Sequence, residues 1–109
     1  LQNIKELSNS KEVIIAIWGA GSGGRHAAEL LRFTGMKPNI FIDSNETKWG
    51  QEVLGCLIYS PDELINLKNQ GKRIYIVIAS VWFNEIEAKL MQLGFKPGLD
   101  YDDNSIYVF

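Results

Sequence analysis

Three glycines near the start of the chain have the spacing that a phosphate-binding turn requires. Gly19, Gly21 and Gly24 form the pattern G-x-G-x-x-G directly after a short apolar run, and a helical pattern follows them. Glycine at the first position permits a sharp turn out of a strand. The second leaves room for a phosphate against the backbone, and the third lets the new helix pack closely on the strand. The pattern therefore predicts an anion site suited to a phosphate or pyrophosphate.

The donors of this site are expected to be the backbone N–H groups of Ser22, Gly23 and Gly24. These groups open the helix, have no partner within it, and lie at the positive end of its dipole. Asp43 follows a second apolar run, at close to the spacing of about 20 residues at which a carboxylate holds an adenosine ribose. Together the two features predict a nucleotide-binding cleft. The alternative is a domain that keeps these glycines for packing and binds no ligand.

Short apolar runs alternate with helical patterns along the rest of the chain. Residues 1–12 are interpreted as the end of a preceding helix and a connector, and residues 13–109 as the nucleotide-binding domain. Helices are expected from about 23 to 33, from a start marked by Ser60 and Pro61 to near 71, and from near 84 to 94. Ser60 is expected as the N-cap, with Glu63 closing a capping box. The predicted strands are Val13–Trp18, Asn39–Asp43, Cys56–Tyr59, Arg73–Ser80 and Ile106–Phe109.

This alternation is typical of an α/β fold with a parallel sheet covered by helices on both faces. The prediction is a three-layer α/β/α, doubly wound sheet of about five strands in the order 3-2-1-4-5. In such sheets ligands bind beyond the carboxyl ends of the strands, where strand order reverses. Ser44 and Ser80 follow two of these ends and are expected to border the ligand. Trp49, in the loop after Asp43, either covers a base or anchors the loop.

Composition and charge exclude several function classes. The net charge is −2, and the 11 Lys and Arg residues are scattered, which argues against nucleic acid and an anionic membrane as partners. Cys56 is the only cysteine, and no signal peptide or membrane-spanning segment is evident. A cytoplasmic protein is expected. The start at Leu1 rather than methionine suggests a piece of a longer protein.

The first predicted helix also has an outward apolar side. At 100° per residue, His26, Leu30 and Phe33 lie opposite the small residues that are expected to face the sheet. An outward Leu and Phe suggest cover by a second subunit or another domain. His26 is the only histidine and has no second ligand at a suitable spacing, so no metal site is expected.

Four stretches carry a family resemblance over about residues 13 to 103. They read I-W-G-A-G-S-G-G-R-H-A-A-E-L-L, I-F-I-D-S-N-E-T-K-W-G, L-G-C-L-I-Y-S-P-D-E-L and I-Y-I-V-I-A-S. The chain resembles the Rossmann-type module that precedes the catalytic part of polysaccharide-biosynthesis sugar-nucleotide dehydratases and epimerases. It is similar also to CoA-binding domains and to the NAD domain of redox-sensing repressors. The resemblance implies NAD as the cofactor, with NADP, a nucleotide sugar or CoA as alternatives. It assigns the phosphate turn to Gly19, Gly21 and Gly24, and the ribose to Asp43.

The sequence departs from the catalytic members of these families because no Tyr is followed four positions later by Lys. No Ser/His/Asp arrangement replaces that proton-transferring pair, so no catalytic residue is predicted. The first hypothesis is a nucleotide-binding module, non-catalytic by itself, of a larger enzyme of sugar-nucleotide or surface-polysaccharide biosynthesis. The alternatives are the cofactor-binding half of an NAD-dependent oxidoreductase and a structural or interaction domain.

Overall fold

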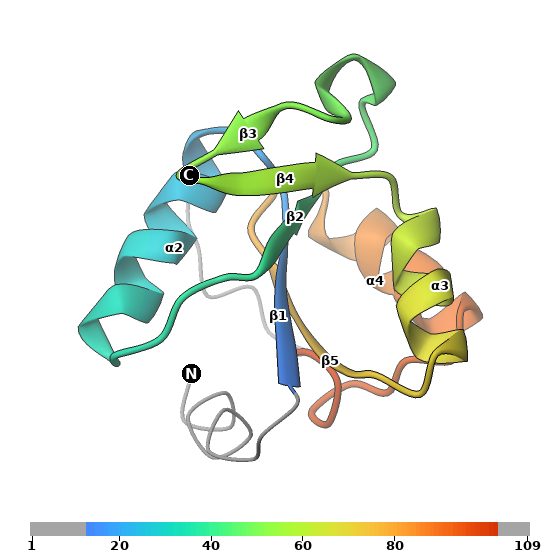
Figure 1. Cartoon of the computed structure of the whole chain (residues 1–109). Coiled ribbons are helices and arrows are strands. Elements are labelled where there is room, and N and C mark those ends of the chain that lie inside the picture. Colours follow the sequence, from blue (N-terminus) through green and yellow to red (C-terminus); the bar gives the residue numbers. More distant parts are fainter. Residues whose placement is uncertain (1–12, 103–109) are drawn as a thin grey trace.

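A computed structural model describes residues 13–102 of the chain, and Figure 1 shows the order of its elements. Helices and strands alternate as the sequence predicts. The elements are β1 (Val13–Trp18), α2 (Ser22–Phe33), β2 (Ile40–Ile42), the 3₁₀ turn η1 (Glu46–Lys48), β3 (Glu52–Val53), β4 (Cys56–Tyr59), α3 (Asp62–Asn69), β5 (Arg73–Ile78) and α4 (Phe83–Gln92).

The five strands form one sheet in the order β3-β4-β2-β1-β5. β1 pairs in parallel with β2 and, over its whole length, with β5, while β4 pairs in parallel with β2. The predicted α/β class and parallel sheet are confirmed, and four predicted strands lie in the predicted order. This is a Rossmann-like fold.

The edge of the sheet differs from the prediction. β3 was not predicted; it pairs antiparallel with β4 through a tight turn at Leu54 and Gly55. The predicted strand at 106–109 and the predicted connector at 1–12 lie outside the described residues, so both stay predictions. After α4 the chain returns beside β5, where the Ile76 N–H donates to the Asp100 carbonyl oxygen at 2.8 Å and Tyr101 bridges to Ile76.

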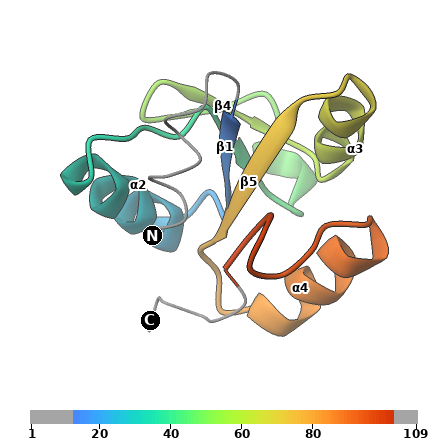
Figure 2. The ribbon, with the colours of Figure 1, turned by 90° about the horizontal axis from the view of Figure 1, so that it is seen from below.

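The sheet separates two apolar layers, because successive side chains of a strand point to opposite faces. On one face Ile15, Ile17 and Tyr75 pack with the buried side of α2. On the other face Trp18 and Ile76 pack with residues of α3 and α4. Figure 2 shows α2 on one side of the sheet and the other two helices opposite. Burial on both faces explains why β1, and β5 after Arg73, are continuous apolar runs.

Two details of the helices differ from expectation. Leu30 is half-buried against the α2-side core, whereas Phe33 is 89% exposed, so the outward apolar side of α2 is narrower than predicted. Cover of this side by a second subunit or domain stays a prediction. At the start of α3, the Glu63 N–H donates to the backbone carbonyl of Ser60, and the Glu63 carboxylate accepts from Asn66, so the predicted capping box does not form. The N-cap is Pro61, with no side-chain cap bond, rather than the predicted Ser60.

Candidate functional site

The carboxyl ends of the parallel strands are tied together at one edge of the sheet. The Gly19 N–H donates to the Ile42 carbonyl at 2.8 Å, and the Ala79 N–H donates to the Trp18 carbonyl at 2.9 Å. The Asp43 N–H donates to the Tyr59 carbonyl at 3.1 Å. The turn after β1 therefore lies between the ends of β2 and β5, where strand order reverses and ligands bind in this class of sheet.

The three glycines of the turn have different surroundings. Gly19 has a φ of +125°, and a Cβ there would overlap the carbonyl oxygen of Ala79. A Cβ at Gly24 would overlap the carbonyl oxygen of Gly19 and lie 3.3 Å from the Phe41 ring. At Gly21 a Cβ would meet only the Nζ of Lys48, at 3.9 Å. The first and third glycines are thus required by close packing, while the second leaves an accessible stretch of backbone.

Helix α2 begins at this accessible stretch. Its first internal hydrogen bond runs from the Arg25 N–H to the Gly21 carbonyl at 3.1 Å. Within residues 13–102 no group accepts from the backbone N–H groups of Ser22, Gly23 and Gly24. Such donors at a helix N-terminus favour an anion. Their role in binding stays a prediction.

Asp43 lies against the glycine turn. Its Oδ2 accepts from the Ala20 N–H at 2.9 Å, and its Oδ1 accepts from the Asn45 N–H at 2.8 Å. The Nζ of Lys48 is 3.9 Å from Oδ2. A carboxylate has about four acceptor positions, so these bonds leave it able to accept from a ribose hydroxyl as well. Asp43 thus positions the turn, and its role in binding a ribose stays a prediction.

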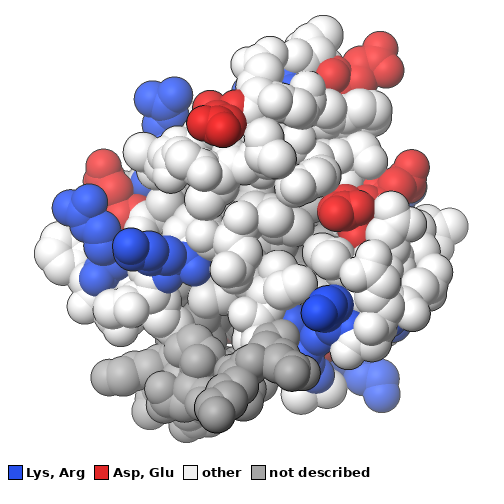
Figure 3. Space-filling model, in the orientation of Figure 1, with Lys and Arg blue, Asp and Glu red and all other residues white. Residues whose placement is uncertain are grey.

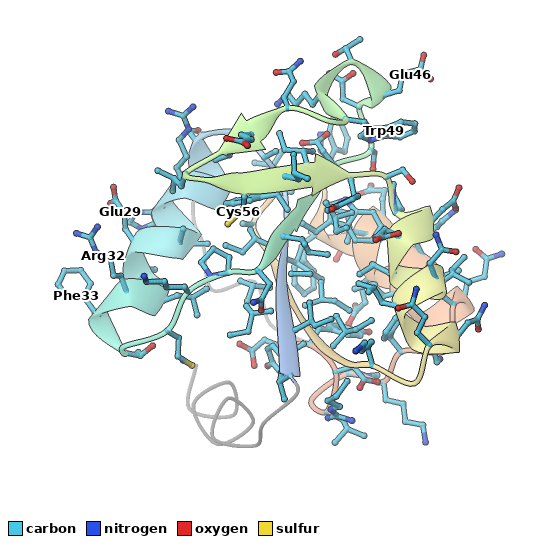
Figure 4. The ribbon with its side chains drawn as sticks, viewed as in Figure 1. Glu29, Arg32, Phe33, Glu46, Trp49 and Cys56 are labelled. Atoms are coloured by element: carbon cyan, nitrogen blue, oxygen red, sulfur yellow. The ribbon has the colours of Figure 1, made fainter. Side chains whose placement is uncertain are left out.

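A cavity of about 540 Å³ opens between the strand ends and α4. Trp49 and Trp82 line it, and their side chains are 41% and 65% exposed. The Trp49 Nε1–H donates to the Asp43 carbonyl at 2.7 Å, so this indole anchors the loop as well as bordering the cavity. Figure 4 shows Trp49 close to the end of β4. The other lining residues are Trp18, Gly19, Asp43, Ser44, Ser60, Pro61, Asp62, Ser80, Glu85, Ile86 and Lys89.

A second hollow of about 390 Å³ lies over the glycine turn itself. Its charged lining residues are Arg25, Lys48 and Glu52, and the predicted residues Gly21 and Ser22 also border it. Of the predicted site residues, Gly19, Asp43, Ser44 and Ser80 line the larger cavity, whereas Gly23 and Gly24 line neither hollow. Trp82 and Lys48 are among the lining residues that the site prediction did not include.

Two further side chains with reactive groups, Ser80 and Cys56, have defined surroundings. Ser80 Oγ accepts from the Trp82 N–H at 3.1 Å, which fixes the start of α4. The Cys56 thiol is outside both hollows, and burial, followed by the charge of Glu52, raises its pKa, so this thiol is not activated. Among residues 13–102, no three His, Cys, Asp or Glu side chains gather to hold a metal ion.

The surface carries charged side chains of both signs (Figure 3). On the face in Figure 3, acidic and basic side chains lie near one another, and neither sign fills a continuous area. Across the described part of the chain, every helix is too short or too polar to cross a membrane.

Two solved structures are similar to this chain. UDP-D-quinovosamine 4-dehydrogenase from Vibrio fischeri is 30% identical, with a TM-score of 0.61 over 84% of this chain and 82% of that protein. RSP, solved in complex with β-NAD⁺ and operator DNA, is 14% identical, with a TM-score of 0.58 over 92% of this chain and 54% of that protein. The second similarity shows the fold alone.

A search of curated proteins gives no match. The model of one protein family, described as C2185-like, N-terminal, matches residues 10–97. Because that match spans most of the sequence, this chain belongs to the C2185-like N-terminal family.

Proposed function

We propose that this chain is a nucleotide-binding module whose ligand is NAD(H), and that it is non-catalytic by itself. The observation that carries the proposal is the glycine turn: the accessible Gly21 backbone borders the hollow over the turn, and the helix N–H donors that follow it have no acceptor within residues 13–102. Phosphates are favoured at such a turn because the backbone donors and the helix dipole both stabilise negative charge.

The two hollows suit the two halves of the ligand's adenosine diphosphate part. The diphosphate would lie in the hollow over Gly21, beside the Lys48 ammonium. The adenosine would lie in the larger cavity, with its ribose at Asp43. Trp49 and Trp82 offer aromatic faces there, and base–aromatic stacking contributes about 1–3 kcal/mol per base where proteins bind single-stranded nucleic acid.

The similar proteins support the assignment. One acts as a dehydrogenase on a UDP sugar, and the other was solved with β-NAD⁺. The first, at 30% identity over most of both chains, also favours a parent enzyme of sugar-nucleotide or surface-polysaccharide biosynthesis. A nucleotide sugar is therefore the second candidate ligand, since its diphosphate would use the same turn.

Two alternative functions are the cofactor-binding half of an NAD-dependent oxidoreductase and a structural or interaction domain. An NAD-dependent oxidoreductase would place its proton-transferring groups outside this sequence, because no Tyr-x-x-x-Lys pair occurs within it. A structural or interaction domain would keep Gly19 and Gly24 for packing and would bind no nucleotide. Accessible N–H donors and exposed tryptophans around the cleft favour binding over this last alternative.

A thermal-melt screen tests the proposal. NADH should raise the melting temperature, because a ligand that binds only the folded state adds about 2.7 kcal/mol of stability at 100 times its dissociation constant. NADPH, UDP-glucose and CoA serve as comparators, with free nicotinamide as the control that lacks phosphates. If none of the nucleotides shifts the melting temperature at millimolar concentration, the chain is an interaction domain and the proposal is wrong.

A further inference from the structure

Lys48 holds a position over the glycine turn that the proposed ligand needs. Its Nζ is 3.9 Å from the Cβ position of Gly21 and 3.9 Å from the Asp43 Oδ2. It also lines the hollow over the turn together with Arg25. The ammonium is thus placed between an acidic side chain and the backbone where a phosphate would bind.

An anion at this turn would encounter a like charge. The Asp43 Oδ2 accepts from the N–H of Ala20, the residue immediately before Gly21, so a negative charge lies directly behind the phosphate position. Glu52 adds a second carboxylate to the lining of the hollow. Like charges at such short range are unfavourable unless a cation offsets them. Lys48 is the only cation within ion-pair distance of Asp43 among residues 13–102.

The segment that carries Lys48 is fixed at both ends. Asn45 Oδ1 accepts from the Thr47 N–H at 3.1 Å and from the Thr47 hydroxyl at 2.8 Å. The Trp49 indole donates to the Asp43 carbonyl at 2.7 Å. Figure 4 labels Glu46 and Trp49, which come two residues before and one residue after this lysine in the sequence. The backbone of Lys48 is therefore held over the turn, while its side chain, 37% exposed, is able to reach a ligand.

We propose that Lys48 is a diphosphate-binding residue that bridges Asp43 and the phosphates of the nucleotide. This inference rests on the proposed function and names the chemistry that the site selects, a nucleotide diphosphate. Lys48 neutralises Asp43 and supplies a charge-assisted donor to the ligand, and Arg25 is the second cation of the hollow. Asp43 then remains available to the ribose, because the ammonium offsets its repulsion of the phosphates.

Titration calorimetry of Lys48→Met with NADH tests this inference. The variant should bind NADH at least tenfold more weakly than the wild type, since it loses the ammonium and leaves Asp43 unneutralised. Lys48→Arg should retain most of the affinity, because it keeps the charge. Lys72→Met is the matched control: Lys72 is exposed at the amino end of β5, away from the cleft, and its loss should leave binding unchanged. Melting curves report whether each variant is folded.

Inorganic pyrophosphate separates the two proposals. If Lys48→Met binds NADH as tightly as the wild type does, the role of Lys48 is wrong, although the proposed function stands. A second outcome is that the wild type does not bind NADH but binds pyrophosphate more tightly than Lys48→Met does. In that case the diphosphate site is supported and the NAD(H) proposal fails. If the wild type binds neither, both proposals are overturned.

Discussion

Gly24→Val should prevent the chain from folding stably, at a cost of at least about 3 kcal/mol. A Cβ at this position overlaps the carbonyl oxygen of Gly19, which is backbone and cannot rotate away. The same atom would lie 3.3 Å from the Phe41 ring, which is fully buried. Helix α2 would have to move off β1 and lose the packing of its buried face. Ordinarily a Gly-to-Val change within a helix is far milder, because β-branched residues are better helix formers than glycine.

Urea denaturation followed by circular dichroism measures this effect. Gly21→Val is the matched control, since it makes the same substitution three residues earlier, where only the end of the Lys48 side chain is nearby. A Gly24→Val variant with a wild-type unfolding midpoint would show that α2 does not pack against the turn as described.

Gly21→Val should abolish nucleotide binding while the chain stays folded. The valine side chain would occupy the space over the exposed backbone, where a phosphate has to approach the N–H groups of Ser22 and Gly23. Losing those charge-assisted hydrogen bonds, each worth about 1.5–3 kcal/mol, should weaken binding by at least a hundredfold. Gly21 has a negative φ of −98°, so the substitution introduces little backbone strain.

Equilibrium binding of NADH, followed by its fluorescence, measures the loss. The melting temperature of Gly21→Val without ligand should stay within a few degrees of the wild type. Wild-type affinity in this variant would place the phosphates elsewhere and remove the glycine turn from the site.

Much of this fold could be predicted because its central strands are buried on both faces. β1 is an uninterrupted apolar run, and so is β5 after its first residue, Arg73; such runs bounded by turns and helices leave few arrangements other than a parallel sheet. The G-x-G-x-x-G pattern placed the start of α2 within one residue, since the glycines are required by the close approach of backbone segments.

The sheet edge could not be predicted in the same way. β3 has only two residues, and its turn places Leu54 at a φ of +51°, a conformation that usually requires Gly, Asn or Asp. The local sequence therefore carried no hairpin signal. Leu30 was assigned outward from helical periodicity alone, but its side chain reaches the apolar layer between α2 and the sheet.

The predicted site contained only residues whose type and spacing in the sequence indicate a role, such as the glycines of the turn and Asp43. Asp43 was found from its spacing, but its bonds to Ala20 and Asn45 depend on how the turn and the next loop meet in space. Trp82 was not included in the predicted site. The helix that follows β5 was expected to begin near residue 84, whereas α4 begins at Phe83 with Trp82 as its N-cap. The position in the sequence did offer a signal: Trp82 lies four residues after Ile78, the last residue of β5, and ligands bind beyond such strand ends.

Calorimetric titration of the wild-type chain with NADH and NADPH tests most directly the central claim that NAD(H) binds at this cleft with its ribose at Asp43. The expected result is one site for NADH and at least tenfold weaker binding of NADPH, a difference of about 1.4 kcal/mol. The 2′-phosphate of NADPH would face the Asp43 carboxylate, with no arginine among Ser44, Asn45 and Glu46 to offset it, while Lys48 is engaged by the diphosphate. Equal affinities, tighter NADPH, or no heat from either dinucleotide would contradict the account.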